Sequence, residues 1–156
     1  MAYENVDVDR AKNAINNCLN SIKHTASSNM ITDLPSNNNW VAESKSTFVG
    51  ALDKLVNTRY SELETYLKKC LQTLDKISSY KSLQSQNATL NSQINSKTTE
   101  YNNTKYKYNK LDDKTTTEAK NLKSKMESLD REIRNLKSKR DDNAGDMSSL
   151  NNAINA

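Results

Sequence analysis

The chain has 156 residues, of which two are glycine, one is proline and 27% are charged. Hydrophobic residues make up only 34% of it, and Trp40 and Phe48 are the sole large aromatic residues besides tyrosine. A compact globule of this length would bury about 70% of its unfolded surface, which needs more apolar side chains than these. The composition excludes a single compact core and leaves two possibilities, a disordered chain or long helices joined along narrow apolar stripes. The scarcity of glycine and proline favours the helices.

The net charge of +4 comes from residues 61–110, which hold eight basic and four acidic residues. A block this weakly basic is typical of a solvated helix face, so we expect no nucleic-acid partner. No apolar run approaches the roughly 18 residues of a membrane span. The first ten residues lack the apolar core of a signal peptide. We therefore expect a chain made in the cytoplasm, with export by a pathway that needs no cleaved signal left open.

Apolar residues near the N-terminus recur at spacings of three and four, which predicts a helix over residues 3–31. Pro35 and the asparagines at 37–39 then predict a loop at residues 32–40, because proline disfavours a helical residue before it and asparagine favours turns. The recurring apolar positions of this first helix are Val8, Ala11, Ile15, Cys18 and Ile22.

A second helix of about 70 residues, spanning on the order of 100 Å, is predicted from near Trp40 to about Leu111. Aspartate and threonine are poor interior helix residues, and Thr115 and Glu118 match a capping box, so a turn is predicted at residues 112–117. A strict heptad of apolar residues follows, which predicts a stripe that faces a helical partner. A stutter in one continuous helix that pairs with a second copy would also explain the change of phase. The stripe consists of Leu122, Met126, Leu129, Ile133 and Leu136.

In an antiparallel hairpin, the numbers of facing residues add to a constant. A tight loop after the first helix gives a sum of about 74, which places Cys18 opposite Val56, and a turn at 112–117 gives about 230, which places Leu129 opposite Tyr101. The predicted fold is all-α, with a helical hairpin over residues 1–80 and a coiled-coil extension over residues 81–156. The extension continues the long central helix and adds a third, antiparallel helix.

The two cysteines have no neighbouring cysteine or histidine at metal-binding spacing, and we expect small buried apolar side chains at both positions. In the first register Cys70 lies opposite residue 4, roughly 20 Å along the axis from Cys18. A disulfide needs Cα atoms within about 7 Å. The sequence therefore predicts no internal disulfide.

Trp40 follows the loop, Ala42 lies two residues later, and Phe48 lies in the next helix. On physical grounds Trp40 either plugs the end of the hairpin or anchors a partner. The layout of residues 1–80 resembles the WXG100 family, although Ala42 replaces the glycine of the family's Trp-x-Gly motif. The resemblance implies a small helical hairpin exported by a bacterial type VII secretion system.

The export signal of that family has the form Tyr-x-x-x-Asp/Glu beside the hairpin. This chain matches it three times, at residues 3–7, 60–64 and 108–112. The resemblance makes Tyr108 and Asp112 the candidate signal, because this match alone follows the first hairpin.

The sequence has no Gly-rich phosphate loop, no nucleophile beside a base, and no carboxylate pair on a scaffold that could exclude water. We expect no catalytic residue, no metal, no cofactor and no small-molecule ligand. The leading hypothesis is a helical partner or small substrate of a type VII-like secretion system, which binds a larger effector or another hairpin through its apolar stripe. The alternative is an intracellular homo-oligomeric coiled-coil spacer or tether. A third and weakest hypothesis is binding of nucleic acid or an anionic membrane through residues 97–110.

Overall fold

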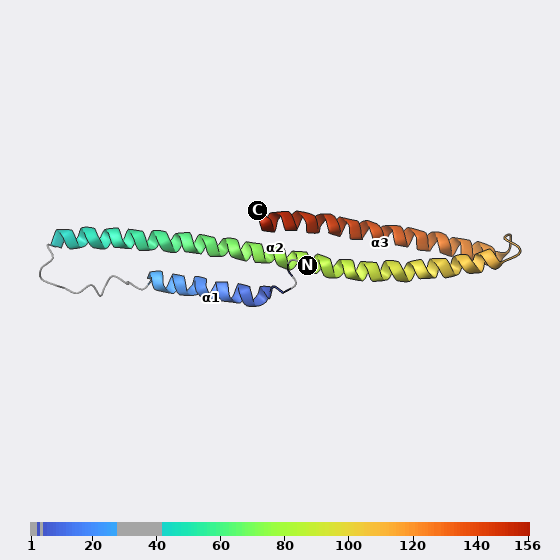
Figure 1. Cartoon of the computed structure of the whole chain (residues 1–156), viewed down its shortest axis with the longest axis horizontal. Coiled ribbons are helices and arrows are strands. Elements are labelled where there is room, and N and C mark those ends of the chain that lie inside the picture. The colour runs from blue at the N-terminus through green and yellow to red at the C-terminus, as the bar shows by residue number, and fades with distance from the viewer. Residues whose placement is uncertain (1–2, 4, 28–41) are drawn as a thin grey trace. The chain divides into compact units, whose positions relative to one another are not determined.

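The computed structural model describes residues 3, 5–27 and 42–156, and 92% of them are helical. Three helices follow one another: α1 spans Val8–Ser27, α2 spans Ala42–Lys110 and α3 spans Thr117–Asn155 (Figure 1). The described ranges contain no strand, which confirms the predicted all-α class. The predicted loop at 32–40 and Trp40 lie outside the described residues.

α1 begins at Val8 rather than at the predicted Tyr3, because Asp7 caps it. The Asp7 carboxylate accepts a hydrogen bond from the Arg10 amide at 3.0 Å, and the Asp7 carbonyl accepts one from the Ala11 amide, also at 3.0 Å. These contacts satisfy amides of the first helical turn that have no partner within the helix. The predicted end of this helix at Ile31 lies outside the described residues.

α2 has 69 residues, close to the predicted length, and is about 100 Å long at 1.5 Å per residue. Several of its threonine hydroxyls form their hydrogen bonds within the helix itself. The hydroxyls of Thr58 and Thr65 donate to the carbonyls four residues earlier, each at 2.8 Å, and Thr99 does the same at 3.0 Å. Hydroxyls that bond to their own helix need no second element to satisfy them.

Residues 111–116 connect α2 to α3. The Lys114 ammonium group donates to the carbonyls of Tyr108, Asn109 and Leu111, at 3.1 Å in the case of Asn109. A lysine in this position satisfies terminal carbonyls and complements the negative end of the helix dipole. Lys114 thus closes the C-terminus of α2.

The N-cap of α3 is Thr116, whose hydroxyl accepts a hydrogen bond from the Ala119 amide at 3.2 Å. The predicted capping box at Thr115 is therefore wrong by one residue. Thr115 instead donates to the Asp113 carboxylate through both its amide and its hydroxyl, each at 2.7 Å. The Thr115 hydroxyl is thus bonded to Asp113, and the cap of α3 is the next residue, Thr116.

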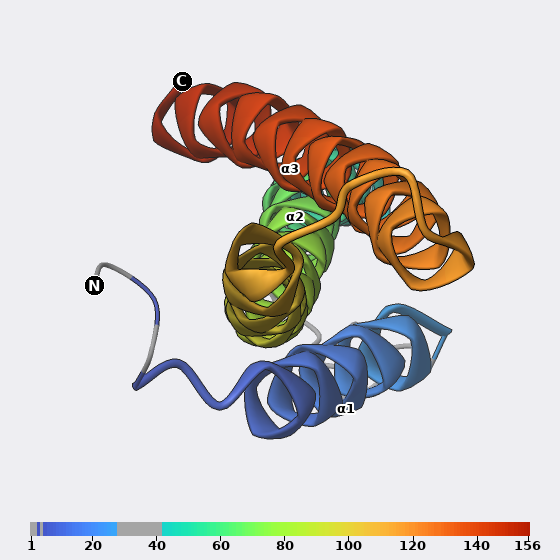
Figure 2. The same cartoon turned by 90° about the vertical axis from the view of Figure 1, so that its right-hand side faces the viewer.

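The chain divides into two compact units, Met1–Ile77 and Ser78–Ala156. The boundary lies inside α2, as does the predicted boundary between residues 80 and 81. The first unit holds α1 and the N-terminal part of α2. The second unit holds the remainder of α2 with α3, which lie side by side (Figures 1 and 2).

The register of the first unit differs from the predicted one. Lys12 pairs with Asp75 at 2.6 Å, and these residue numbers add to 87. The pKa of Glu64 is lowered mainly by Lys68 of the same helix and to a smaller extent by the charge of Lys23, whose number adds with that of Glu64 to 87 as well. The predicted sum of about 74 is therefore wrong, by nearly two heptads. An apolar stripe that repeats every seven residues looks the same after such a slide, so the apolar pattern alone does not choose between the two registers.

The buried residues of the first unit come from both helices. Leu19 is buried in α1, whereas its neighbour Cys18 is exposed, so the predicted place of Cys18 in the apolar stripe is wrong. Cys70 is half-buried, so the expectation of two buried cysteines fails for both. The buried apolar residues of this unit are Val8, Leu19, Ile22 and Ile77.

The predicted register of the second unit, about 230, is confirmed. Lys97 pairs with Glu132 and Glu100 with Lys125, each at 2.8 Å, so these residue numbers add to 229 and 225. The buried residues of this unit include one polar side chain, Thr104, whose hydroxyl donates to the Glu100 carbonyl at 2.8 Å. Its buried residues are Ile94, Thr104, Ala119, Leu129 and Ile133.

Candidate functional site

The α3 stripe that was predicted to face a partner packs within the second unit. Leu129 and Ile133 are only 3% and 9% exposed, and Leu122, Met126 and Leu136 are half-buried. The ion pairs between α2 and α3 place this stripe against α2 of the same chain. The helix that this stripe faces in the structure is α2 of the same chain, as the predicted register of about 230 implies.

The most exposed apolar surface of the first unit lies on α2. Phe48, Leu55, Leu63 and Tyr66 are 46%, 55%, 42% and 64% exposed, and we call these four residues the apolar face. At 100° per residue, Phe48, Leu55 and Tyr66 lie within about 20° of one another around the helix, and Leu63 lies roughly 60° from Phe48. Eighteen residues separate the ends of the face, so it runs for about 27 Å along the helix.

Three residues of the apolar face, Phe48, Leu55 and Tyr66, lie roughly 110–130° around α2 from the mean direction of the half-buried leucines at 67, 71 and 74, and Leu63 lies between the two groups. In the observed register, Ser27 at the end of α1 is level with about residue 60 of α2. Phe48 and Leu55 therefore lie beyond the level of the described part of α1. Tyr66 lies within that level yet is exposed, whereas Leu67, the next residue, is half-buried. α2 thus uses one side for α1 and presents a second apolar side to solvent.

A charged pair interrupts the apolar face. Arg59 pairs with Glu62 at 2.8 Å, and both side chains project between Leu55 and Tyr66 on the same side of the helix. A polar pair within an apolar stripe is a common way to fix the register of a helical partner. The face therefore combines apolar area with one polar feature that a partner has to match.

The WXG100-like residues are distributed differently with respect to this face. Phe48 belongs to it, and Ala42 is the first residue of α2. Trp40 lies outside the described residues. Of the predicted motif residues whose side chains are described, Phe48 lies on the exposed face.

The candidate export signal lies at the end of α2. Tyr108 is half-buried in the last turn, its carbonyl accepts a hydrogen bond from the Leu111 amide at 3.3 Å, and its ring lies 4.8 Å from the Lys114 ammonium group. Asp112 is exposed in the connection that follows. Tyr108 therefore takes part in closing the helix, whereas the Asp112 side chain is accessible from outside.

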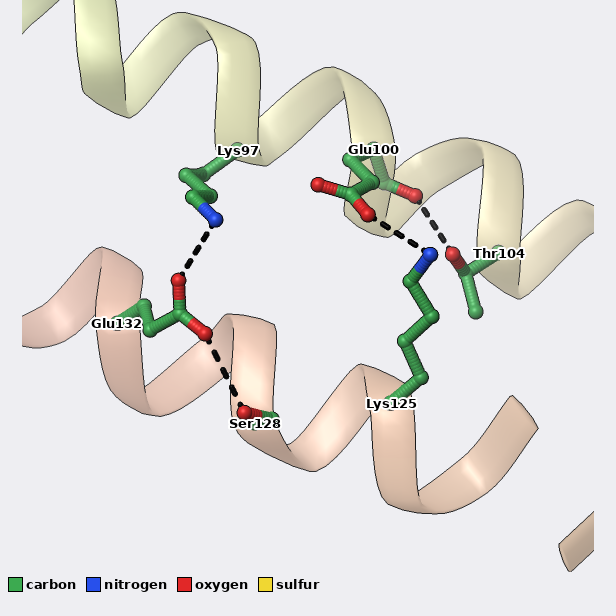
Figure 3. Close-up of polar contacts among 6 residues, drawn as sticks. All are labelled: Lys97, Glu100, Thr104, Lys125, Ser128 and Glu132. Carbon is green, nitrogen blue, oxygen red and sulfur yellow. Dashed lines mark hydrogen bonds and ion pairs between the residues drawn. The ribbon is translucent and has the colours of Figure 1, made fainter. Parts of the chain in front are cut away.

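The second unit carries an ion-pair ladder formed by Lys97, Glu100, Lys125 and Glu132 (Figure 3). The hydrogen bond and charge of Lys97 lower the pKa of Glu132, and those of Lys125 lower the pKa of Glu100. Glu132 in turn raises the pKa of Lys97. Each helix contributes one acid and one base, which opposes a slide of one helix along the other.

Within the described ranges, no group of three or more histidine, cysteine, aspartate or glutamate residues could hold a metal ion. No described helix is both long enough and apolar enough to cross a membrane. The exposed apolar face was missed at the sequence level because apolar spacing alone does not separate exposed positions of the second helix from those that pack on α1. No family model matches the sequence, and neither a curated protein nor a solved structure matches it significantly.

Proposed function

We propose that this chain is a non-enzymatic interaction protein whose apolar face on α2 binds a helix of a second protein. The observation that carries the proposal is the exposure of four large apolar side chains, 42–64% exposed, on one stretch of α2. At a rise of roughly 1.5 Å per residue this stretch is about 27 Å long. Exposed apolar side chains aligned along one helix are the usual docking surface for another amphipathic helix.

The energetics of the face indicate what kind of partner it needs. Full burial of a large apolar side chain stabilises by about 1.5–3 kcal/mol, so burial of four half-exposed ones contributes roughly 3–6 kcal/mol. Association itself costs about 4–15 kcal/mol in lost freedom of motion. A single short helix would therefore bind weakly. We expect the partner to be a helical hairpin or a larger helical protein that covers additional surface of the first unit.

The test is the mass in solution of the purified chain, alone and after co-expression with the products of neighbouring genes. Leu55→Lys places a charge in the middle of the apolar face, and Ser61→Lys adds the same charge at an exposed position on another side of α2. We expect a 1:1 hetero-complex that Leu55→Lys abolishes and Ser61→Lys retains. A monomer under all conditions would refute the proposal. A homodimer sensitive to Leu55→Lys would support the alternative, a homo-oligomeric coiled-coil spacer.

A narrower proposal is that the chain is a partner or small substrate of a type VII-like secretion system. It rests on the WXG100-like layout of Trp40, Ala42 and Phe48. Export from the native host tests it with Asp112→Asn, which changes an exposed residue of the connection, and with Asp146→Asn as a matched exposed control. Loss of export in the first variant only would support a signal at Tyr108 and Asp112. A native chain that stays in the cell would contradict the secretion proposal and leave helix binding intact.

A further inference from the structure

The register of the first unit brings its two cysteines to the same level. The ion pair of Lys12 with Asp75 gives a sum of 87, and the smaller effect of the Lys23 charge on the pKa of Glu64 agrees with it. The numbers of Cys18 and Cys70 add to 88, so the two residues are offset by one position, or about 1.5 Å along the axis. This reverses the sequence-based conclusion, which placed them roughly 20 Å apart.

The two cysteines also lie on the same side of the hairpin. On α1, Cys18 is roughly 70° to one side of the buried stripe of Val8, Leu19 and Ile22, and Lys12 and Lys23 are roughly 50–70° to the other side. On α2, Cys70 is roughly 70° to one side of the half-buried leucines at 67, 71 and 74, and the two acids are roughly 50–70° to the other.

The charged flanks of α1 and α2 face each other, as the ion pair shows. In an antiparallel pair the opposite flanks then face each other as well, and these carry Cys18 and Cys70. Helix axes in contact are about 8–10 Å apart and Cα atoms lie about 2.3 Å from each axis, which puts the two Cα atoms roughly 6.5–8.5 Å apart. This range brackets the limit of about 7 Å for a disulfide, so a small rotation of α1 is sufficient to bring the sulfurs together.

We propose that Cys18 and Cys70 form an intramolecular disulfide site that joins α1 to α2. Both thiols are free in this structure, Cys18 being exposed and Cys70 half-buried. The oxidant is a low-molecular-weight disulfide such as oxidised glutathione. The Cys18 thiolate attacks one of its sulfurs and releases one glutathione thiol. The Cys70 thiolate then attacks the Cys18 sulfur of the mixed disulfide and releases the second.

Two protein thiols are thus oxidised by two electrons while one small disulfide is reduced to two thiols. The exposed Cys18 reacts first because the oxidant reaches it more easily. The bridge holds α1 against the side of α2 that carries the half-buried leucines, and Cys70 lies roughly 40° from Tyr66 around the helix, at the edge of the apolar face. The disulfide proposal rests on the register of α1 and α2 and does not require the proposed docking function.

The full chain at low concentration, without denaturant, is incubated with oxidised glutathione and digested under non-reducing conditions for mass spectrometry. We expect the Cys18–Cys70 cross-link in the monomer as the main product. We also expect the melting temperature to rise by roughly 5–10 °C, because the closed loop restricts the unfolded chain. Glutathione adducts on both cysteines without a bridge, or intermolecular bridges alone, would overturn the proposal.

A second variant separates the two registers. Val56→Cys combined with Cys70→Ser moves the second thiol to the position that the register of about 74 places opposite Cys18. We expect this variant to acquire glutathione adducts and no bridge. Efficient bridging in it would show that α1 slides freely along α2 and that the cysteine pair is not a specific site. In denaturant both chains should bridge at similar rates, which provides the reference for the folded state.

Discussion

Truncation of Leu129 tests whether the α3 stripe is the core of the second unit or a surface for a partner. Leu129 is 3% exposed, whereas Leu55 on the apolar face is 55% exposed. Leu→Ala at each position removes the same atoms from two different environments. The comparison therefore isolates the effect of burial from the effect of the amino-acid change.

The expected magnitudes follow from these exposures. Removal of the nearly fully buried Leu129 side chain loses its transfer free energy and leaves a cavity, which together cost about 3 kcal/mol. At Leu55, less than half of the side chain is covered and solvent fills the space, so the cost is about 1 kcal/mol or less. For a chain of this length the difference of about 2 kcal/mol corresponds to roughly 4–8 °C in melting temperature.

Thermal unfolding followed by circular dichroism at several protein concentrations measures both effects. Leu129→Ala should lower the melting temperature strongly and independently of concentration. Leu55→Ala should change it little in the isolated chain. Equal losses for the two variants would refute the assignment of Leu129 to the core and of Leu55 to the surface. A concentration-dependent loss in Leu55→Ala would show that the apolar face is already covered by a second copy.

Thr116→Ala should destabilise the chain by about 1 kcal/mol through loss of the α3 cap, whereas Thr117→Ala in the same turn should cost less; a larger effect at Thr117 in thermal melts would place the cap wrongly. Lys114→Met should lower the free energy of unfolding by about 0.5 kcal/mol, since the terminal carbonyls of α2 lose their cation. The melting temperature should fall slightly as a result. The ion pairs with Lys125 and Lys97 lower the pKa of Glu100 and of Glu132. They therefore stabilise the second unit at pH values above the ordinary glutamate pKa of 4.5, and this contribution is lost as the pH falls through the lowered pKa values. The free energy of unfolding should be measured against pH for the native chain and for a Glu100→Gln, Glu132→Gln chain. The two curves should converge below that pH range and diverge above it, and parallel curves would contradict the ion-pair ladder.

The two hairpins differ in how far the sequence predicted them, and their connections explain why. The connection of the second hairpin is short and its ends are marked by poor helix formers, so a turn at 112–117 fixed the register near 230. The predicted register of the first hairpin rested on an assumed tight loop at residues 32–40, which lie outside the described residues. The apolar pattern alone could not test that assumption, because it repeats every seven residues.

The candidate site was also only partly predictable from the sequence. Phe48 was singled out from its spacing to Trp40, but the sequence did not distinguish Leu55, Leu63 and Tyr66 from the residues of the second helix that pack on α1. A helix that binds neighbours on two sides and a helix that binds one neighbour have similar apolar content. Burial distinguishes the exposed residues from the packed ones, and burial depends on which side α1 occupies.

The sequence by itself determined the helices, their approximate ends and the antiparallel path of the second hairpin, because helix propensity, apolar periodicity and capping are local properties of the chain. Only the tertiary structure decided the register of α1, the exposure of the apolar face and the closeness of Cys18 to Cys70. The physical reason is that a repeating apolar stripe packs almost equally well after a slide of whole heptads. The choice among such registers rests on single polar contacts between residues distant in sequence, such as that of Lys12 with Asp75.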